Sequence, residues 1–278
     1  MSRPYAEVIG DPIAQSKSPL IHNFWLAKLG IDAEYRACHV RPEERGDYFA
    51  QRGADTAWRG CNVTIPHKER VASFLDQVDD RAQAIGAINT VFRTTEGGLT
   101  GTNTDVDGIA EAVGHVDLVG QEVCVIGAGG AARAAFYFLS NMRCAAVLVM
   151  ARDPEKALRV ASEFPIFAVG VKLQAGSGAL CEARLLINAT QLGMTGQESM
   201  PSFVLDELSE LDSGGLVFDM VYAPLQTSLL DTARRVGLRA SDGLSMLIGQ
   251  AAVAFEKFFG QPPPRDDGDR ELRALLTA

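Results

Sequence analysis

A glycine-rich turn between an apolar strand and a helix constrains the fold of this chain more than any other feature. Residues 123–126 (VCVI) are followed by GAGGAA at residues 127–132, which matches the pattern G-x-G-x-x-G/A. The first glycine permits a tight turn, the second lets the backbone approach a pyrophosphate, and the last small residue keeps the helix close to its strand. The pattern predicts a Rossmann-type dinucleotide-binding domain with the phosphates at the helix N-terminus. A glycine-rich turn that binds no ligand is the alternative that the motif alone leaves open.

The end of the next predicted strand indicates the kind of dinucleotide. An acidic residue at this place accepts a hydrogen bond from the 2′-hydroxyl of NAD, but this strand is followed by Arg152. A guanidinium suits the 2′-phosphate of NADP, and Lys156 follows one helical turn later. Asp153 precedes Pro154 and is expected to be a helix N-cap, which turns its carboxylate onto backbone amides. NADP is therefore the predicted cofactor, and NAD is the alternative.

Strand-like segments alternate with helical patterns along the chain, which is typical of α/β folds. The predicted strands cover residues 6–10, 34–39, 60–64, 87–92, 99–102, 122–126, 145–150, 185–188 and 216–221. The predicted helices cover residues 19–29, 43–52, 68–78, 131–142, 154–163, 244–259 and 270–276. The glycines at residues 97–98 predict a hairpin between the fourth and fifth strands.

A chain of 278 residues exceeds the usual size of one compact core, so we expect two domains. A second βαβ series starts at residue 122, and the last long helix is expected to return to the first domain. We therefore predict two α/β domains flanking a cleft. The N-terminal substrate-binding catalytic domain would hold residues 1–105 plus 244–278, and the NADP-binding Rossmann domain residues 106–243.

Composition limits the partners and the compartment. The net charge of −9 argues against nucleic acid and anionic membranes as partners. The uncharged run at residues 243–255 is too short to cross a bilayer, and residues 1–12 do not resemble a secretory signal. Five scattered cysteines without a Cys-x-x-Cys pair indicate reduced thiols rather than disulfides or a zinc site. We expect a cytoplasmic protein with a small-molecule substrate.

Two polar segments of the first domain are candidates for catalysis. Residues 60–68 (GCNVTIPHK) run from a strand into a predicted helix whose first turn contains Lys68. The positive end of a helix dipole disfavours an ammonium, which favours Lys68 as a proton-transfer group; a solvated helix start is the alternative. The neighbouring His67 is expected to be structural or exposed. Residues 100–108 (TGTNTDVDG) place Asp105 at the domain boundary, either as a helix N-cap or as a catalytic partner of Lys68.

Further short blocks stand in a characteristic order along the chain. They are GDPI at 10–13 with SKSP at 16–19, GCNVT at 60–64, GAINT at 86–90, NTD at 103–105, NAT at 188–190, DMVYAPL at 219–225 and DGLSML at 242–247 with Gln250. Together with the glycine-rich turn, these blocks resemble the shikimate dehydrogenase family from about residue 6 to residue 260.

The resemblance implies an oxidoreductase that interconverts 3-dehydroshikimate and shikimate with NADPH, in the biosynthesis of chorismate and aromatic amino acids, without a metal. It implies that hydroxyl groups hold the substrate carboxylate, from Ser16, Ser18, Thr64 and Tyr222. It implies that the ring hydroxyls are bound by Lys68, Asn89, Asp105 and Gln250, of which Lys68 and Asp105 form the catalytic pair. The residues that it assigns to the cofactor are Gly127, Ala128, Gly129, Gly130, Ala131, Arg152, Lys156, Thr190, Met220 and Gly243.

The chain differs from the common family pattern beside the cofactor, at Ala151 and at residues 191–192 (QL). These differences leave open a shikimate dehydrogenase-like paralogue. Three further alternatives are a quinate/shikimate or aminoshikimate dehydrogenase with either NADP or NAD as its cofactor, a non-catalytic nucleotide-binding regulator, and another two-domain dehydrogenase such as a methylenetetrahydrofolate enzyme. The expected assembly is a monomer or a homodimer.

Overall fold

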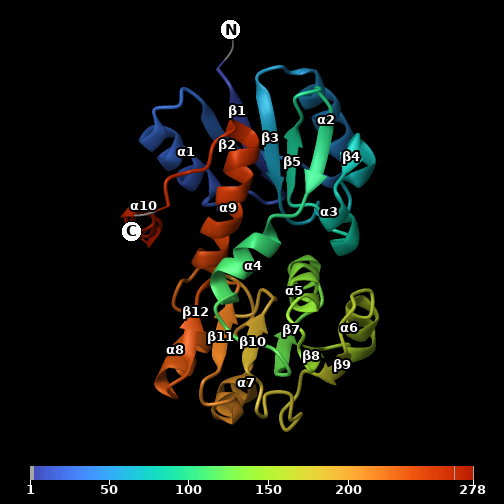
Figure 1. The fold of residues 1–278 in the computed structure, drawn as a ribbon, viewed down its shortest axis with the longest axis vertical. Helices are drawn as coiled ribbons and strands as arrows, with labels where there is room; N and C mark the ends of the chain where they lie inside the picture. Colours follow the sequence, from blue (N-terminus) through green and yellow to red (C-terminus); the bar gives the residue numbers. More distant parts are fainter. Residues whose placement is uncertain (1–2, 266, 278) are drawn as a thin grey trace. The chain divides into compact units, whose positions relative to one another are not determined.

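The computed structural model describes residues 3–265 and 267–277. The chain forms two compact units, each with one six-stranded sheet and flanking helices (Figure 1). Unit 1 comprises Met1–Thr104 and Gln250–Ala278, and unit 2 comprises Asp105–Gly249. The predicted fold class of two α/β domains is confirmed. The predicted first domain includes Met1, Ser2, Asp266 and Ala278, which lie outside the described residues.

Unit 2 is a doubly wound parallel sheet. Its strands are β7 (Glu122–Ile126), β8 (Ala146–Ala151), β9 (Ala168–Lys172), β10 (Leu185–Asn188), β11 (Leu216–Asp219) and β12 (Arg239–Ser241). Its helices are α4 (Asp105–Val113), α5 (Gly130–Ser140), α6 (Pro154–Ala161), α7 (Ser202–Asp206) and α8 (Ser228–Arg235). The strand order is β12-β11-β10-β7-β8-β9, and all the pairs are parallel. In this topology ligands bind where the order reverses, at the carboxyl ends of β7 and β10.

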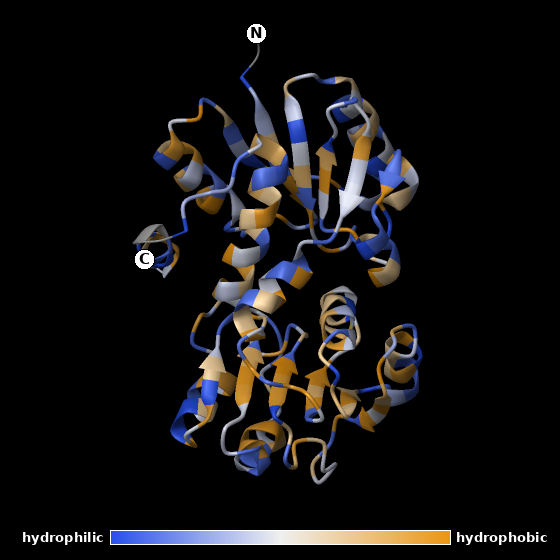
Figure 2. Cartoon of the chain, viewed as in Figure 1, coloured by the Kyte–Doolittle hydropathy of each residue, from blue (hydrophilic) through white to orange (hydrophobic). Residues whose placement is uncertain are grey.

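The sequences of the central strands explain this arrangement. Strands of a parallel sheet that helices cover on both faces are apolar almost without interruption. All four residues of β10 and of β11 are buried, as are the last four of β7. Figure 2 shows these strands as the most hydrophobic stretch of unit 2. Polar residues therefore begin where each strand ends.

Unit 1 has a mixed sheet. Its strands are β1 (Tyr5–Gly10), β2 (Glu34–His39), β3 (Trp58–Val63), β4 (Gln77–Val78), β5 (Thr90–Arg93) and β6 (Leu99–Thr102), in the order β2-β1-β3-β5-β6-β4. Its helices include α1 (Ser18–Leu29), α2 (Arg45–Ala54), α3 (Asp80–Ile85) and α10 (Asp267–Thr277), while α9 (Gly243–Phe259) runs from unit 2 into unit 1. Strand β5 is antiparallel to β3 and to β6, which confirms the predicted hairpin. The start of β5 consequently lies beside the end of β3, with Asn62 opposite Thr90.

A buried carboxylate fixes α2 against the sheet of unit 1. Glu7 of β1 is fully buried. Its oxygens accept hydrogen bonds from Arg52 Nε at 2.7 Å, Arg36 Nε at 3.0 Å and the Tyr48 hydroxyl at 2.9 Å. Burial of a charge is tolerated where ion pairing and hydrogen bonds compensate the lost hydration.

The predicted helix at residues 68–78 is wrong. The segment forms turns at residues 65–70, a short 3-10 helix at Ala72–Phe74 and strand β4. The pairing of Gln77 with Thr100 of β6 replaces helical bonding, because a strand partner is available in the folded sheet. Lys68 therefore lies in a turn, and the helix dipole does not act on it as predicted.

Candidate active site

Six of the predicted substrate residues belong to unit 1, and they follow the topology of its sheet. Ser16 and Ser18 come after β1, Thr64 and Lys68 come after β3, and Asn89 directly precedes β5. Since β1 and β3 are parallel and β5 is antiparallel to β3, these segments meet at one edge of the sheet. The sixth residue, Gln250, lies in α9. The remaining two, Asp105 and Tyr222, belong to unit 2.

The loop after β1 presents two hydroxyls at the start of α1. Ser18 is the first residue of this helix, and its backbone N–H donates to Ser16 Oγ at 3.3 Å. The N-cap position is held by Lys17, which makes no side-chain cap bond. The loop is tied to the turn after β3, because Asp11 N–H donates to the carbonyl of Ile65 at 3.1 Å. Serine hydroxyls beside a helix N-terminus suit a carboxylate ligand.

The turn that carries Lys68 is held by its backbone and by His67. Thr64 N–H donates to the carbonyl of Ile9 at 3.0 Å, and Ile88 N–H donates to the carbonyl of Lys68 at 2.8 Å. His67 is buried and its Nε2 lies 2.7 Å from the carbonyl of Val40, so this nitrogen must be the donor. Burial lowers the pKa of His67, which keeps the ring neutral. Of the two places expected for His67, structural or exposed, the structure shows the buried one, and the ring anchors the turn next to Lys68.

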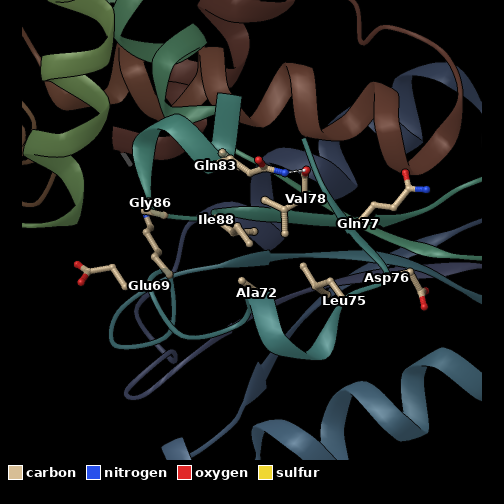
Figure 3. Close-up of a pocket in the computed structure, with 12 residues that line it drawn as sticks. Glu69, Ala72, Leu75, Asp76, Gln77, Val78, Gln83, Gly86 and Ile88 are labelled. Carbon is tan, nitrogen blue, oxygen red and sulfur yellow. Dashed lines mark hydrogen bonds between the residues drawn. The ribbon is translucent and has the colours of Figure 1, made fainter. Parts of the chain in front are cut away.

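A cavity of about 390 Å³ opens beside this turn (Figure 3). Leu75, Val78 and Ile88 point into it, while Glu69 and Asp76 lie at its two ends. Of the predicted substrate residues that the structure describes, Lys68 alone lines it. The cavity is therefore distinct from the sheet edge that carries the serines and Asn89.

Asn89 and Gln250 are brought together although 161 positions separate them. Asn89 Nδ2 donates to Gln250 Oε1 at 3.5 Å and to Thr104 Oγ1 at 3.0 Å. The backbone N–H of Thr104 donates to Asn89 Oδ1 at 2.7 Å. Both amides are buried, so their orientation is determined by these partners.

In unit 2 the glycine-rich turn has the predicted strand–turn–helix context. Gly127 has φ +105°, and a Cβ at this residue would lie 2.6 Å from Thr190 Cγ2, so glycine is required on both counts. Gly129 is the N-cap of α5, and among the described residues no atom lies within 4 Å of where its Cβ would stand. The N–H groups of Gly130 and Ala131 follow, and in a helix these first donors have no intrahelical acceptor. Open space and unpaired helix donors suit a pyrophosphate.

The loop after β8 exposes two cations and uses its carboxylate as a helix cap. Asp153 is the N-cap of α6 and accepts from Lys156 N–H at 3.0 Å, with Pro154 at the first helical position, as predicted. Arg152 and Lys156 are exposed. Within the described part of the chain, the guanidinium of Arg152 has no hydrogen-bond or ion-pair partner. The carboxylate is thus used by the helix, and the guanidinium remains available to a ligand.

A cluster of polar side chains around Asn188 and Asp219 ties the ends of β10 and β11 together. The sequence motifs assign no role to these two residues. Asn188 Nδ2 donates to Asp219 Oδ1 at 2.9 Å, and the hydroxyl of Thr227 donates to Asp219 Oδ2 at 2.7 Å. Thr190 Oγ1 donates to Asn188 Oδ1 at 2.6 Å, which places Thr190 beside Gly127. Burial raises the pKa of the Asp219 carboxyl, while its hydrogen bonds oppose that shift. The sequence feature that could have predicted this cluster is a polar residue at the last position of two buried strands, Asn188 in β10 and Asp219 in β11.

Close backbone packing joins two further cofactor candidates. A Cβ at Gly243 would overlap the backbone carbonyl of Met220, so only glycine fits at the start of α9.

The two predicted substrate residues of unit 2 are Tyr222 and Asp105. Tyr222 follows shortly after β11, and burial raises the pKa of its phenol, which therefore stays a protonated donor. Asp105 is the first residue of α4, where the helix dipole favours a carboxylate.

Metal-binding clusters and membrane-spanning helices are both absent from the described residues. No group of three or more His, Cys, Asp or Glu side chains among them is arranged to hold a metal ion. None of the described helices is long and apolar enough to cross a membrane.

Comparisons with known proteins agree with these features along the chain. A family model for the shikimate dehydrogenase substrate binding domain matches residues 8–91. A shikimate/quinate 5-dehydrogenase model matches residues 109–195, and a shikimate 5′-dehydrogenase C-terminal domain model matches residues 243–273.

Individual relatives match nearly the whole chain. The shikimate dehydrogenase (NADP(+)) of Sphingopyxis alaskensis is 50% identical over 275 residues, which covers 99% of this chain and 97% of the relative. That of Methylobacterium radiotolerans is 42% identical over 284 residues, covering 100% and 98%. The crystal structure of shikimate 5-dehydrogenase from Thermus thermophilus in complex with NADP(H) and shikimate has a TM-score of 0.85 at 36% identity, covering 98% of this chain and 99% of that chain. The resemblance inferred from the sequence is confirmed, and this chain belongs to the shikimate dehydrogenase family.

Proposed function

We propose that this chain catalyses the reversible NADPH-dependent reduction of 3-dehydroshikimate to shikimate, in the biosynthesis of aromatic amino acids. One observation carries the proposal: the hydroxyls of Ser16, Ser18 and Thr64, the amide of Asn89 and the ammonium of Lys68 come from segments that meet at one edge of the sheet of unit 1. A carboxylate ligand with several ring hydroxyls requires such a set of uncharged donors with a single cation.

Each substrate residue has a role in the proposed reaction. Ser16, Ser18, Thr64 and Tyr222 donate hydrogen bonds to the carboxylate of the substrate. Asn89 and Gln250 bind ring hydroxyls. Lys68 and Asp105 are the catalytic pair, in which the ammonium of Lys68 gives a proton to the 3-oxygen as its carbonyl becomes an alcohol, and the carboxylate of Asp105 balances the ammonium charge.

NADPH supplies the hydride for this reduction when it is bound. The turn at Gly127, Ala128 and Gly129 and the helix N-terminus at Gly130 and Ala131 hold the pyrophosphate. Thr190, Met220 and Gly243 complete the proposed set of cofactor residues: Thr190 lies beside Gly127, and Gly243 packs against the carbonyl of Met220. Arg152 and Lys156 bind the 2′-phosphate, and the use of Asp153 as a helix cap supports NADP over NAD.

The domain roles, location and assembly are part of the proposal. Residues 1–105 plus 244–278 bind the substrate, and residues 106–243 bind NADP. A cytoplasmic location is supported by the five cysteines, all of which are free thiols. The partners are small molecules, and the protein acts as a monomer or a homodimer.

Initial rates with purified protein test the proposal. Shikimate and quinate are each combined with NADP and NAD+, and the absorbance of the reduced nicotinamide is followed. We expect the highest kcat/KM with shikimate and NADP. A higher value with quinate or NAD+ would keep the family but contradict the substrate or cofactor assigned. Nucleotide binding without any turnover would instead favour a regulatory protein.

A further inference from the structure

A continuous row of buried polar side chains leads from the interior of unit 1 to the two substrate amides. Its members are uncharged, each is at most 7% exposed, and they come from five separate segments of the chain. They are Tyr35, Asn62, Thr90, Asn89, Thr104 and Gln250. Buried polar groups of this kind are costly unless each is paired, so their hydrogen-bond directions are restricted.

The hydrogen bonds of Asn62 determine which end of its side-chain amide is the nitrogen. Its amide faces the backbone carbonyl of Asn89 at 3.4 Å, and since a carbonyl can only accept, the atom on that side must be Nδ2. The same nitrogen donates to Thr90 Oγ1 at 3.0 Å. Asn62 Oδ1 then faces the hydroxyl of Tyr35 at 2.6 Å, which must donate. Burial raises the pKa of Tyr35 well above its usual value, so the phenol keeps its proton.

The direction at Asn89 is determined independently. A backbone N–H can only donate, so the Asn89 atom that lies 2.7 Å from Thr104 N must be Oδ1. Thr90 Oγ1 already accepts from Asn62, and of the two acceptors within reach of its own proton, Asn89 Oδ1 at 3.0 Å is closer than Thr104 Oγ1 at 3.2 Å. The oxygen of Asn89 is therefore engaged from two sides, and its nitrogen must face Thr104 Oγ1 and Gln250.

The same logic extends to Gln250. Its Oε1 lies 3.5 Å from both Asn89 Nδ2 and Thr104 Oγ1. Because a nitrogen donor of Asn89 faces it, this atom is the oxygen, and the nitrogen of Gln250 is turned the other way. These two contacts are the longest in the row, and they are the ones that a bound hydroxyl can replace.

We infer that Thr90 and Asn62, with Tyr35 behind them, are positioning residues that set the donor and acceptor ends of the Asn89 and Gln250 amides. One series of donors runs from the Tyr35 hydroxyl through Asn62 and Thr90 to Asn89 and on to Gln250. Thr104 lies beside this series and exchanges hydrogen bonds with Asn89 in both directions. The two amides consequently meet the substrate with their N–H groups, so that the ring-hydroxyl oxygens accept and their protons are given elsewhere. This inference rests on the proposed function for the identity of the substrate.

Two substitutions at Thr90 separate this role from a merely structural one. Thr90→Val removes the hydroxyl and keeps the shape, whereas Thr90→Ser keeps the hydroxyl and removes a methyl group. Both lose some thermal stability, because Thr90→Val removes the nearer of the two acceptors of Asn62 Nδ2 and Thr90→Ser leaves a small cavity. We expect kcat/KM for shikimate to fall about tenfold in T90V, the equivalent of one buried hydrogen bond, and to be rescued to within about twofold of wild type in T90S. The KM for NADP should stay unchanged in both.

Tyr35→Phe tests the far end of the row. It removes the first donor and keeps the ring that stacks on His22 at a centroid distance of 4.0 Å. We expect the KM for shikimate to rise about threefold, less than in T90V because the lost bond is more remote. Equal kcat/KM values for T90V and T90S, or a parallel change in the KM for NADP, would overturn the positioning role.

The wild-type rate with shikimate and NADP tests the proposed function by itself. The ratio of T90S to T90V, taken on whichever ring-hydroxyl acid the wild type turns over, tests the positioning role. If the wild type turns over neither acid, the proposed function fails, and calorimetric dissociation constants for shikimate replace the rates. Dissociation constants that are equal in T90S and T90V would then overturn the inference, and weaker binding in T90V alone would support it.

Discussion

The two units differ in the polar side chains that each places at the ends of its central strands. In unit 2 all the sheet pairs are parallel, and the polar group at the strand ends is centred on a carboxylate, that of Asp219. In unit 1 an antiparallel strand is inserted, and the corresponding group consists of neutral amides and hydroxyls around Asn89.

The difference matches the ligands that each unit is proposed to bind. Unit 2 uses its buried side chains to hold loops, so that backbone N–H groups and a helix N-terminus meet a polyanion. Unit 1 uses its buried side chains to orient other side chains. The oriented side chains can then distinguish the acceptor oxygen of a ligand hydroxyl from its donor proton. Substitutions in the two units should therefore alter different kinetic constants.

The largest effect is expected from Lys68→Met, which keeps the aliphatic stem and removes the ammonium. The group that exchanges a proton with the 3-oxygen, giving it in the reduction and taking it in the oxidation, is then missing from the transition state, so kcat should fall roughly 10²–10⁴-fold. The KM for NADP should change little, because the proposed cofactor residues belong to unit 2. Steady-state rates with shikimate and NADP measure both constants.

Glu69→Gln is the matched control, since Glu69 is the exposed neighbour of Lys68 in the same turn. It should leave kcat within about twofold of wild type. A near-normal kcat in Lys68→Met would remove Lys68 from the catalytic pair.

A smaller and more selective effect is expected from Arg152→Ala in unit 2. A charge-assisted hydrogen bond to the 2′-phosphate contributes about 1.5–3 kcal/mol, so the KM for NADP should rise roughly 10–100-fold. The KM for NAD+ and the kcat should hardly change. Arg159→Ala removes another exposed arginine, from the body of α6, and serves as the control. Equal losses with both cofactors would assign Arg152 to packing rather than to discrimination.

The same contrast explains how far the sequence predicts the structure. The turn at Gly127 and the cap at Asp153 depend on residues within a few positions of each other, and both were predicted correctly. Strands β9 and β12 were not predicted, because they are short edge strands with partly exposed residues and weak apolar patterns. Helices α3, α7 and α8 were also missed, and all three are at most eight residues long.

The errors in unit 1 arise from contacts between distant segments. Residues 68–78 have helical composition, yet β4 forms because β6 offers a partner. The direction of the Asn89 amide depends on Asn62 and Thr104, which no periodicity connects with it. The sequence motifs selected Asn89 and Gln250 as site residues, but the hydrogen bonds that orient them became visible only in the folded sheet.

The last effect concerns stability rather than catalysis, and it sharpens the comparison by reporting on unit 1 alone. His22 is fully buried, it stacks on Tyr35, and within the described residues neither ring nitrogen has a hydrogen-bond partner. Burial lowers the pKa of His22 from 6.5 to about 3. The unfolded chain therefore binds a proton below pH 6.5 that the folded chain does not bind until about pH 3. The free energy of unfolding should fall through this window by up to about 1.4 kcal/mol per pH unit.

His22→Phe keeps the stack and removes the titrating group, so its unfolding free energy should depend less on pH between 6.5 and 4 than that of the wild type. Urea unfolding followed by tryptophan fluorescence measures this in unit 1, because both tryptophans, Trp25 and Trp58, lie there. His115→Gln in unit 2 is the control, since His115 is exposed and should leave the pH dependence unchanged. Carboxylates contribute to the acid slope of every variant equally, so the quantity that decides is the difference between His22→Phe and wild type. Identical slopes would mean that His22 reaches solvent, or a partner, before unit 1 unfolds.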